Sequence, residues 1–227
     1  MRLRLIWGAA GVILALIGSI LMAAIMSFEV VEEFERQVAD FFGAPHAVAV
    51  DCCTHALELC LRHQNIQSFS APKRTYISVP FLSQKLNIDF EWRDEDWQDY
   101  YYLGGTNIID AAVLWKKNSY ISDTFMCLSF QYRKHLSLGR GGAILTNNKN
   151  AAEALKKMVY DGRISNVPWR EQNISSIGYH YYMTPEIATL GLEKLPTAIE
   201  TKPHRWVVTD WPDLTEMDVF KNKNGDF

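Results

Sequence analysis

The stretch CLSFQYRKHLSLGRGGAILT, residues 127–146, joins two apolar runs through a basic, glycine-rich connection. The runs at 125–130 and 143–146 predict two strands, and the glycines at 139, 141 and 142 predict a bend between them. Lys134 lies in this connection. A lysine between two buried strands is partly desolvated, which lowers its pKa, and its neutral amine can condense with an aldehyde. An isolated lysine here could equally be a solvated residue of a basic hairpin.

Outside this stretch, helical and strand-like patterns alternate. Helical spacing of apolar residues predicts helices at 28–42, 54–63, 150–159 and 184–199, and short apolar runs predict strands at 47–50, 88–92 and 106–110. Gly43 is a typical stop for the first helix, and residues 68–72 read as a short polar link. We therefore predict an α/β domain with a mostly parallel central sheet flanked by helices.

The turn at 51–54 (Asp-Cys-Cys-Thr) joins a predicted strand to a predicted helix. Such a turn presents free backbone N–H groups that can bind an anion, and Thr54 is a suitable N-cap. Every strand-to-helix turn has these features, so the residues alone leave phosphate binding and an ordinary turn both open. The residues alone also leave two roles open for Asp110, which ends a predicted strand: it can be a site residue or the N-cap of a following helix.

Several segments together resemble the DegT/DnrJ/StrS-type sugar aminotransferases. The Ser-Phe, Lys134 and Gly-x-Gly-Gly pattern is similar to that family's lysine segment, and four further matches follow the family's order at 32–57, 72–94, 108–112 (IIDAA) and 177–195. The resemblance covers roughly residues 28–200, and ordered matches of this kind do not arise readily by chance. It implies the large domain of a fold type I enzyme that uses pyridoxal 5'-phosphate (PLP).

The resemblance also implies a role for each matching residue. Lys134 would be the catalytic residue that binds PLP covalently, and the remaining matches would contact the cofactor: Asp110 at the pyridine nitrogen, Tyr76 stacked on the ring, Cys53, Thr54 and Ser129 at the phosphate, and His180 at the phosphate of a neighbouring subunit. No metal site is expected. The acceptor would be a keto nucleotide sugar used in polysaccharide or glycan precursor synthesis, the amino donor glutamate, and the assembly a homodimer.

The chain departs from the family pattern at several points. Cys53 replaces a glycine, which would strain the turn if it required positive φ, and Tyr182 replaces an arginine. The segment 94–110 is short, and a polar tail at 201–227 stands where relatives carry a second, smaller domain. These departures leave two alternatives open: a degenerate homologue that binds PLP or sugar nucleotide without turnover, and a membrane-tethered interaction module. Retention of Lys134 and Asp110 argues against a pure scaffold.

Composition sets broader limits. The 227 residues are 48% hydrophobic and 22% charged, which suits one well-buried core, and a net charge of −3 gives no reason to expect a nucleic-acid partner. The six histidines show no metal-ligand spacing, and the four cysteines make no CxxC pair. A disulfide framework is therefore not expected, and a reducing, cytoplasmic location fits better.

The N-terminal segment 1–27 is the compositional exception. Leu5 to Met26 carries no charge and is long enough at helical rise to span a hydrocarbon core of about 30 Å. It therefore predicts an apolar helix that could tether the protein to a membrane. Arg2 and Arg4 place its start in the cytoplasm and the main domain outside, which conflicts with a cytoplasmic cofactor. A signal peptide and an upstream extension remain as alternatives.

Overall fold

The computed structural model describes residues 27–221. Its helices are α2 (Glu29–Phe42), α3 (Cys53–His63), α4 (Ser78–Leu86), α5 (Lys149–Val159), α6 (Pro185–Glu200) and α7 (Asp218–Lys221), with short 3-10 turns η1 (Trp169–Glu171), η2 (Val208–Asp210) and η3 (Leu214–Glu216). Its strands are β1 (His46–Val50), β2 (Ser68–Pro72), β3 (Asp89–Arg93), β4 (Tyr101–Tyr102), β5 (Ile108–Asp110), β6 (Phe125–Ser129) and β7 (Gly142–Thr146).

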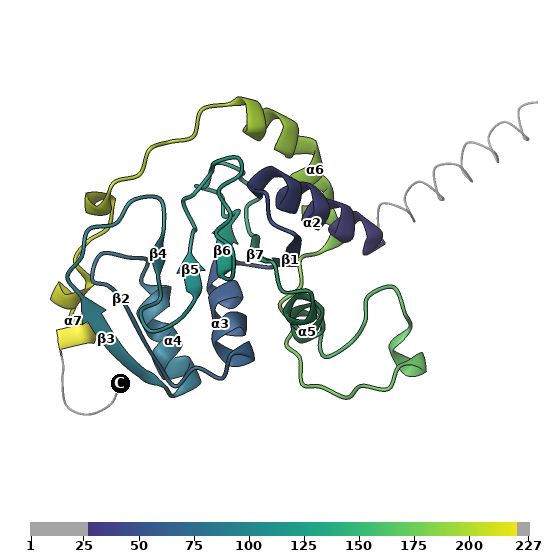
Figure 1. Cartoon of the computed structure of the whole chain (residues 1–227), viewed down its shortest axis with the longest axis horizontal. Coiled ribbons are helices and arrows are strands. Elements are labelled where there is room, and N and C mark those ends of the chain that lie inside the picture. The colour runs from purple at the N-terminus through teal and green to yellow at the C-terminus, as the bar shows by residue number, and fades with distance from the viewer. Residues whose placement is uncertain (1–26, 222–227) are drawn as a thin grey trace, which may run out of the picture.

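The central sheet has the strand order β1-β7-β6-β5-β4, and β2 and β3 form a second, two-stranded sheet (Figure 1). An isolated bridge between Ser70 and Gly104 joins β2 to the chain just after β4. The expectation of a mostly parallel sheet is wrong. Only β5–β6 and β2–β3 pair in parallel, whereas β1–β7, β6–β7 and β4–β5 pair antiparallel, so the sheet is mixed.

Direct returns of the chain account for two of the three antiparallel pairs. Parallel neighbours need a crossover of a dozen or more residues, usually a helix. The chain returns from β6 to β7 through the turns at 130–141, which contain no helix, and from β4 to β5 through residues 103–107. Gly139 makes the first return possible because its φ of 81° lies in the left-handed region.

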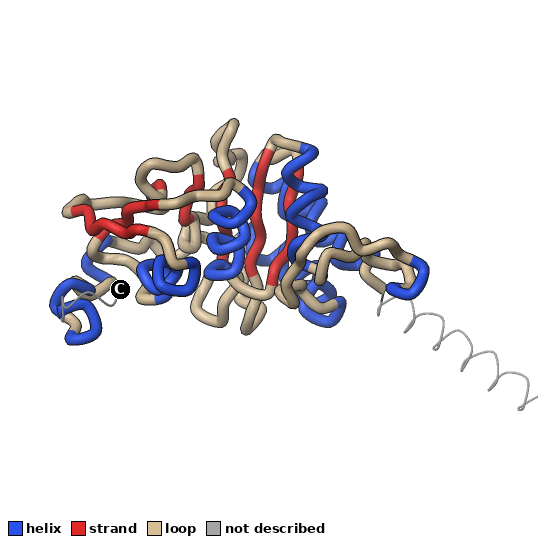
Figure 2. The backbone as a smooth tube through the Cα atoms, turned by 90° about the horizontal axis from the view of Figure 1, so that it is seen from below, coloured by secondary structure: helices blue, strands red, loops and turns tan. Residues whose placement is uncertain are grey.

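Helices cover both faces of the central sheet and create two apolar cores (Figure 2). On one face, α2 and α6 pack on Ala47, Ala49 and Leu128, whose side chains alternate with those of the opposite face. On that opposite face, α3, α4 and α5 pack on a set that includes Val48, Val50 and Ile144. The result is a three-layer arrangement of helices, sheet and helices.

The packing of α2 on α6 depends on one small residue. Gly191 faces the ring of Phe34, which is fully buried. A Cβ atom at position 191 would lie 2.5 Å from a carbon of that ring, closer than a non-bonded contact allows. The two helices can therefore approach this closely only because residue 191 has no side chain.

Most of the predicted helices and strands are confirmed, and local exceptions have clear causes. Helix α2 ends where Gly43 adopts the left-handed conformation, with φ at 74°. Residues 68–72 form strand β2 rather than a polar link, because Phe69 and Ala71 point into the core. Thr54 is not the N-cap of α3, since the helix begins at Cys53 after the extended residue Cys52.

The segment 201–221, expected from its composition to be a polar tail, packs against the domain. After α6 it passes over the ends of β5 and β4 and reaches α7 beside β3 (Figure 1). Leu214 is 1% exposed, its backbone N–H donates to the Lys73 carbonyl at 2.9 Å, and the ring of Phe220 stacks on Phe81. Scattered apolar side chains thus fix a mainly polar segment.

The predicted apolar helix at 1–27, with its candidate membrane tether at 5–26, falls almost entirely outside the described residues. Among residues 27–221, none of the helices combines the length and the apolar character that a membrane span requires.

Candidate functional site

The strands that carry the predicted site residues end at one edge of the central sheet. β5 runs parallel to β6, and β1 runs in the same direction because both β1 and β6 pair antiparallel with β7. The carboxyl ends of β1, β5 and β6 therefore lie at the same edge of the sheet. Asp51 follows β1, Asp110 is the last residue of β5, and Ser129 is the last residue of β6. Ligands of open α/β sheets bind in the crevice at such an edge.

Asp110 is a buried carboxylate, 6% exposed, at the end of β5. Tyr101 donates its O–H to Asp110 Oδ2 at 2.6 Å, and the backbone N–H of Ala112 donates to Oδ1 at 2.9 Å. Thr75 forms a hydrogen bond to the same Tyr101 hydroxyl. Burial raises the pKa of Asp110, while the two donated hydrogen bonds and the charge of Lys134 act in the opposite direction.

Lys134 lies in the turn after β6 and is half-buried. Desolvation lowers its pKa, and nearby Asp110 and Cys53 oppose that shift. Its Nζ atom also lies 5.3 Å from the centroid of the Trp206 ring, within the range of a cation–π contact. The structure therefore brings Lys134, Asp110 and Cys53 into one electrostatic neighbourhood.

The turn between β1 and α3 leads from the extended residue Cys52 directly into the helix. Cys53 is the first residue of α3 and has no positive φ, so the expected strain at this position is not found. Its Sγ contacts the carbonyl of Cys127 at 3.5 Å, and burial raises the pKa of the thiol well above its ordinary value. A Cβ atom at position 142 would lie 2.8 Å from the backbone nitrogen of Cys53, which is too close for a non-bonded contact. Strand β7 can therefore lie this close to the turn only because residue 142 is a glycine.

Thr54 and Ser129, the other two predicted phosphate contacts, lie beside this turn. The Thr54 hydroxyl is 2.7 Å from that of Ser78, at the start of α4. Ser129 is the last residue of β6 and its hydroxyl accepts a weak hydrogen bond of 3.5 Å from the Gln131 N–H. Both are half-buried.

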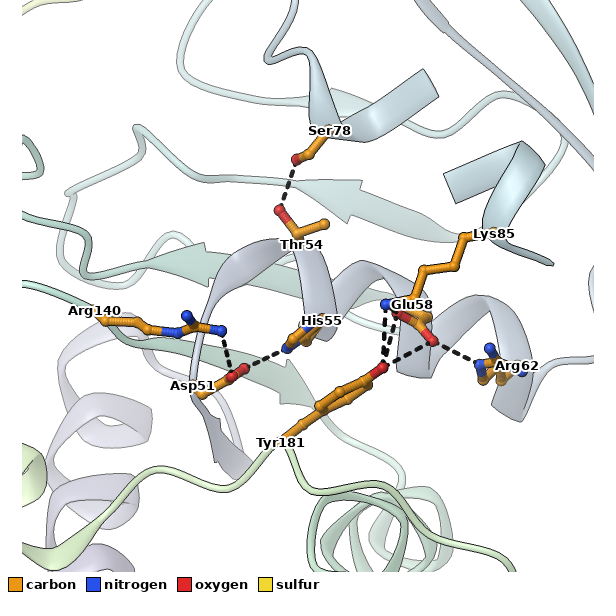
Figure 3. Close-up of polar contacts among 9 residues, drawn as sticks. All are labelled: Asp51, Thr54, His55, Glu58, Arg62, Ser78, Lys85, Arg140 and Tyr181. Carbon is orange, nitrogen blue, oxygen red and sulfur yellow. Dashed lines mark hydrogen bonds and ion pairs between the residues drawn. The ribbon is translucent and has the colours of Figure 1, made fainter. Parts of the chain in front are cut away.

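Charged residues follow the same turn onto α3 (Figure 3). Asp51 accepts hydrogen bonds from Arg140 at 2.7 Å and from His55 at 2.6 Å. Burial alone would lower the pKa of His55, but its contacts with Asp51 and Cys52 raise it to about 9. Ligand atoms of Asp51, Cys52 and His55 lie within 4.8 Å of one another, a grouping that the sequence analysis did not find. The cations Arg140 and His55 neutralise Asp51.

Further along α3, Glu58 is fully buried. It forms ion pairs with Arg62 at 2.9 Å and Lys85 at 2.7 Å, and the Tyr181 hydroxyl lies 3.4 Å from it (Figure 3). The ring of Tyr181 in turn stacks on His55, with centroids 3.6 Å apart. This network ties α3 to α4 and to the chain at 179–182.

Two predicted site residues lie on the surface. Tyr76 is 60% exposed, just before α4. His180 pairs with Asp161 at 3.1 Å, its side chain is 69% exposed, and it packs edge-on against Tyr182. Neither position contradicts a contact with a ligand or a neighbouring subunit, but both roles stay predictions.

A separate cavity of about 410 Å³ lies between α2 and α5. Its walls include Phe28, Glu35, Lys156, Tyr160 and Tyr182, and none of the predicted site residues lines it. It is therefore separate from the residues around Lys134.

Two residues that contact the predicted site residues Asp110 and Lys134 could not be identified from the sequence. Tyr101 lies in the short acidic segment that was interpreted as a remnant, and Trp206 lies in the expected polar tail. The available signal was aromatic content, since tyrosines at 100–102 and tryptophans at 206 and 211 are unusual in solvated segments.

Known structures share this fold. AtS13 from Actinomadura melliaura superposes with a TM-score of 0.68 at 19% identity, over 82% of this chain and 65% of that one. PseC of Helicobacter pylori, an aminotransferase involved in pseudoaminic acid biosynthesis, superposes with a TM-score of 0.62 at 15% identity. The match covers 73% of this chain and 57% of PseC. The PLP form of the putative sugar aminotransferase Spr1654 from Streptococcus pneumoniae superposes with a TM-score of 0.61 at 17% identity. The match covers 74% of this chain and 59% of Spr1654.

The fold is thus that of the fold type I PLP-dependent transferases. The sequence profile of the DegT/DnrJ/EryC1/StrS aminotransferase family matches residues 17–82 and 116–210, and the chain belongs to this family. The spore coat polysaccharide biosynthesis protein SpsC of Bacillus subtilis (strain 168) is 26% identical, over 73% of this chain and 56% of its own length. The chain thus spans little more than half of that relative.

The residues present fit the cofactor that this family implies, PLP. A half-buried lysine with a lowered pKa suits an aldehyde, and a buried carboxylate beside it suits a protonated ring nitrogen. The start of α3 offers backbone N–H groups to a phosphate. These three features lie at one edge of the sheet.

Proposed function

We propose that this protein is a PLP-dependent aminotransferase that transfers an amino group from glutamate to a keto nucleotide sugar. The observation that carries the proposal is the neighbourhood of Lys134 and Asp110, in which a desolvated amine lies close to a buried carboxylate. Membership of the aminotransferase family supports the reaction class.

Each predicted site residue would have one task. Lys134 would hold the aldehyde carbon of PLP, and Asp110 would hold a positive charge on the ring nitrogen. Cys53 and Thr54, at the start of α3, and Ser129, at the end of β6, would bind the phosphate. Tyr76 would cover the ring, and the exposed His180 would serve the phosphate of a second subunit.

Once bound, PLP supplies an electron sink that stabilises negative charge developing on the Cα atom of the donor. The protein must supply the proton carrier. Burial favours the neutral amine of Lys134, which is the form able to accept a proton from that carbon. Asp110 supports this chemistry only as an anion, so the hydrogen bond from Tyr101 also matters.

The acceptor class rests on the relatives. SpsC is a spore coat polysaccharide biosynthesis protein, and PseC takes part in pseudoaminic acid biosynthesis. We therefore propose a keto nucleotide sugar used in glycan precursor synthesis as the substrate.

A second candidate is a protein that binds PLP or sugar nucleotide without turnover. Two contacts favour it: Tyr101 already occupies one oxygen of Asp110, and Trp206 lies over Lys134. Transamination requires a site that excludes water and orients both reactants, which a shortened segment at 94–110 makes harder.

We also propose a homodimer. Large apolar side chains are exposed along 164–177, among them Ile164, Trp169 and Ile177, and exposed apolar patches mark interaction surfaces. A two-fold interface would use the same patch on both subunits.

The test begins with the cofactor. The protein is incubated with PLP, treated with borohydride, digested and mapped by mass spectrometry. We expect the label on Lys134, and none on that peptide in Lys134→Arg. A label on another lysine would contradict the assignment.

A second experiment separates turnover from binding. The PLP form is mixed with glutamate and its absorbance followed, and a keto nucleotide sugar is then added. Steady turnover supports the aminotransferase. A change with glutamate alone limits activity to the first half-reaction, and no change with any amino donor supports binding without turnover.

A further inference from the structure

The segment 201–214 runs from the end of α6 to the Lys73–Arg74 region, on the side of the central sheet where β5 and β4 lie (Figure 1). Its far end is firmly attached. The guanidinium of Arg74 donates to the Trp211 carbonyl at 2.9 Å, and Lys73 pairs with Asp213 at 3.3 Å. Buried Leu214 completes the attachment.

Aromatic side chains form a continuous series from Trp206 to Tyr101. The ring centroids of Trp206 and Trp211 are 5.4 Å apart, and those of Trp211 and Trp97 are 4.8 Å apart. The centroids of Trp97 and Tyr101 are 5.0 Å apart. One end of the series contacts Lys134 through Trp206, and the other contacts Asp110 through Tyr101. One series of aromatic rings thus contacts both ionisable groups of the site.

We propose that Trp206 is a positioning residue for the Lys134 amine: it covers the amine, limits its access to water and confines it to the side of the crevice that holds Asp110. This proposal rests on the proposed function only in taking Lys134 as the reactive amine.

Trp206 has two opposing effects on the ammonium group. As a cover it removes water, which favours the neutral amine, and as a π face it attracts the cation by about 0.5–2 kcal/mol. Burial is the largest influence on the pKa of Lys134 and lowers it despite the nearby charges of Asp110 and Cys53, while the charge of Arg133 also lowers it. We take the indole that lies over the amine to be part of that burial. Loss of the indole should therefore raise the pKa of the amine.

The experiment measures the amine directly in the cofactor-free protein. Trace labelling with acetic anhydride is carried out across a range of pH, and the acetylated fraction of Lys134 is divided by that of Lys149, which is 75% exposed. The pH midpoint reports the protonation of Lys134 independently of any enzyme activity. Better access for the reagent changes the plateau of the curve, whereas a change of environment moves its midpoint.

We expect the midpoint in Trp206→Ala to rise by about one pH unit, equivalent to about tenfold less neutral amine at neutral pH. Trp206→Leu, which keeps the cover but loses the π face, should leave the midpoint unchanged or lower it. Tyr132→Ala is the matched control, because Tyr132 lies in the same turn as Lys134 and is 65% exposed. Its midpoint should equal that of the parent protein.

An unchanged or lower midpoint in Trp206→Ala overturns the proposal. If Trp206→Ala does not fold, as judged by circular dichroism, Trp206→Ser and Trp206→Leu replace it, and equal midpoints in these two overturn it. The test is also distinct from that of the proposed function. A shifted midpoint together with no borohydride-trapped PLP would uphold the role of Trp206 and reject Lys134 as a cofactor ligand.

Discussion

The phenol of Tyr101 and the carboxylate of Asp110 form a buried pair, with Tyr101 donating to Asp110 Oδ2 at 2.6 Å. The two residues face each other because β4 and β5 pair antiparallel with Tyr101 directly opposite Asp110. A short hairpin therefore places a hydrogen-bond donor on the carboxylate on which the proposed chemistry depends. Burial and the neighbouring carboxylate raise the pKa of Tyr101 well above its ordinary value, so it remains a donor at neutral pH.

Replacing Tyr101 by Phe should raise the pKa of Asp110. A hydrogen bond to a charged group contributes about 1.5–3 kcal/mol, which corresponds to about one to two pKa units. The carboxyl resonance of Asp110, followed by NMR during a pH titration, would measure the shift. Tyr102→Phe is the control, since Tyr102 is on the same strand but 39% exposed. Equal titration in both variants would contradict the assigned hydrogen bond.

His55 should make stability depend on pH. Its pKa of about 9 in the folded chain lies above the ordinary value of 6.5, so folding is favoured most when the group is protonated in both states. The contribution is complete below about pH 6.5 and is lost as the pH rises through about 9. Urea unfolding between pH 6 and 10 should show this decline, and His55→Gln should show a smaller one. If the free energy of unfolding falls with pH equally in the parent protein and in His55→Gln, the pH dependence does not come from His55.

Glu58 gives a second test of stability. It is a fully buried carboxylate paired with Arg62 and Lys85, both partly exposed. Removing both cations leaves an unpaired buried charge, so Arg62→Ala with Lys85→Ala should lower the free energy of unfolding by about 3–5 kcal/mol. Adding Glu58→Leu removes that charge and should restore much of the loss. If the triple variant is no more stable than the double variant, the ion pairs do not carry this energy.

The proposed dimer depends on exposed apolar residues at 164–177. Ile177 is 81% exposed, so Ile177→Asp should shift sedimentation from dimer to monomer, whereas Val219→Asp, at a 45% exposed position on α7, should not. Binding of PLP measured on the same samples tests whether the site is shared. A monomer that binds PLP as tightly as the parent protein would argue against a phosphate contact from His180 across the interface.

The sequence predicts the helices well because their apolar spacing and stop signals are local. Helix α2 and Gly43 are an example. Strand direction is not local, so the antiparallel pairing of β6 with β7 could not be read from two apolar runs. Lys134 and Asp110 were found because they match a motif, and the structure brings them together. Tyr101 and Trp206 were not, because their importance comes from tertiary contacts between distant segments.

The contact between Phe34 and Gly191 bears on how the chain is made. Phe34 belongs to the first described helix and Gly191 to α6, so the apolar side of α2 lacks this partner until residue 191 has left the ribosome. Until then the part of that surface that α6 covers is exposed on an incomplete chain, and incomplete chains with exposed apolar surface are prone to aggregation. The order of helices in the fold thus separates α2 from its α6 partner by most of the described chain.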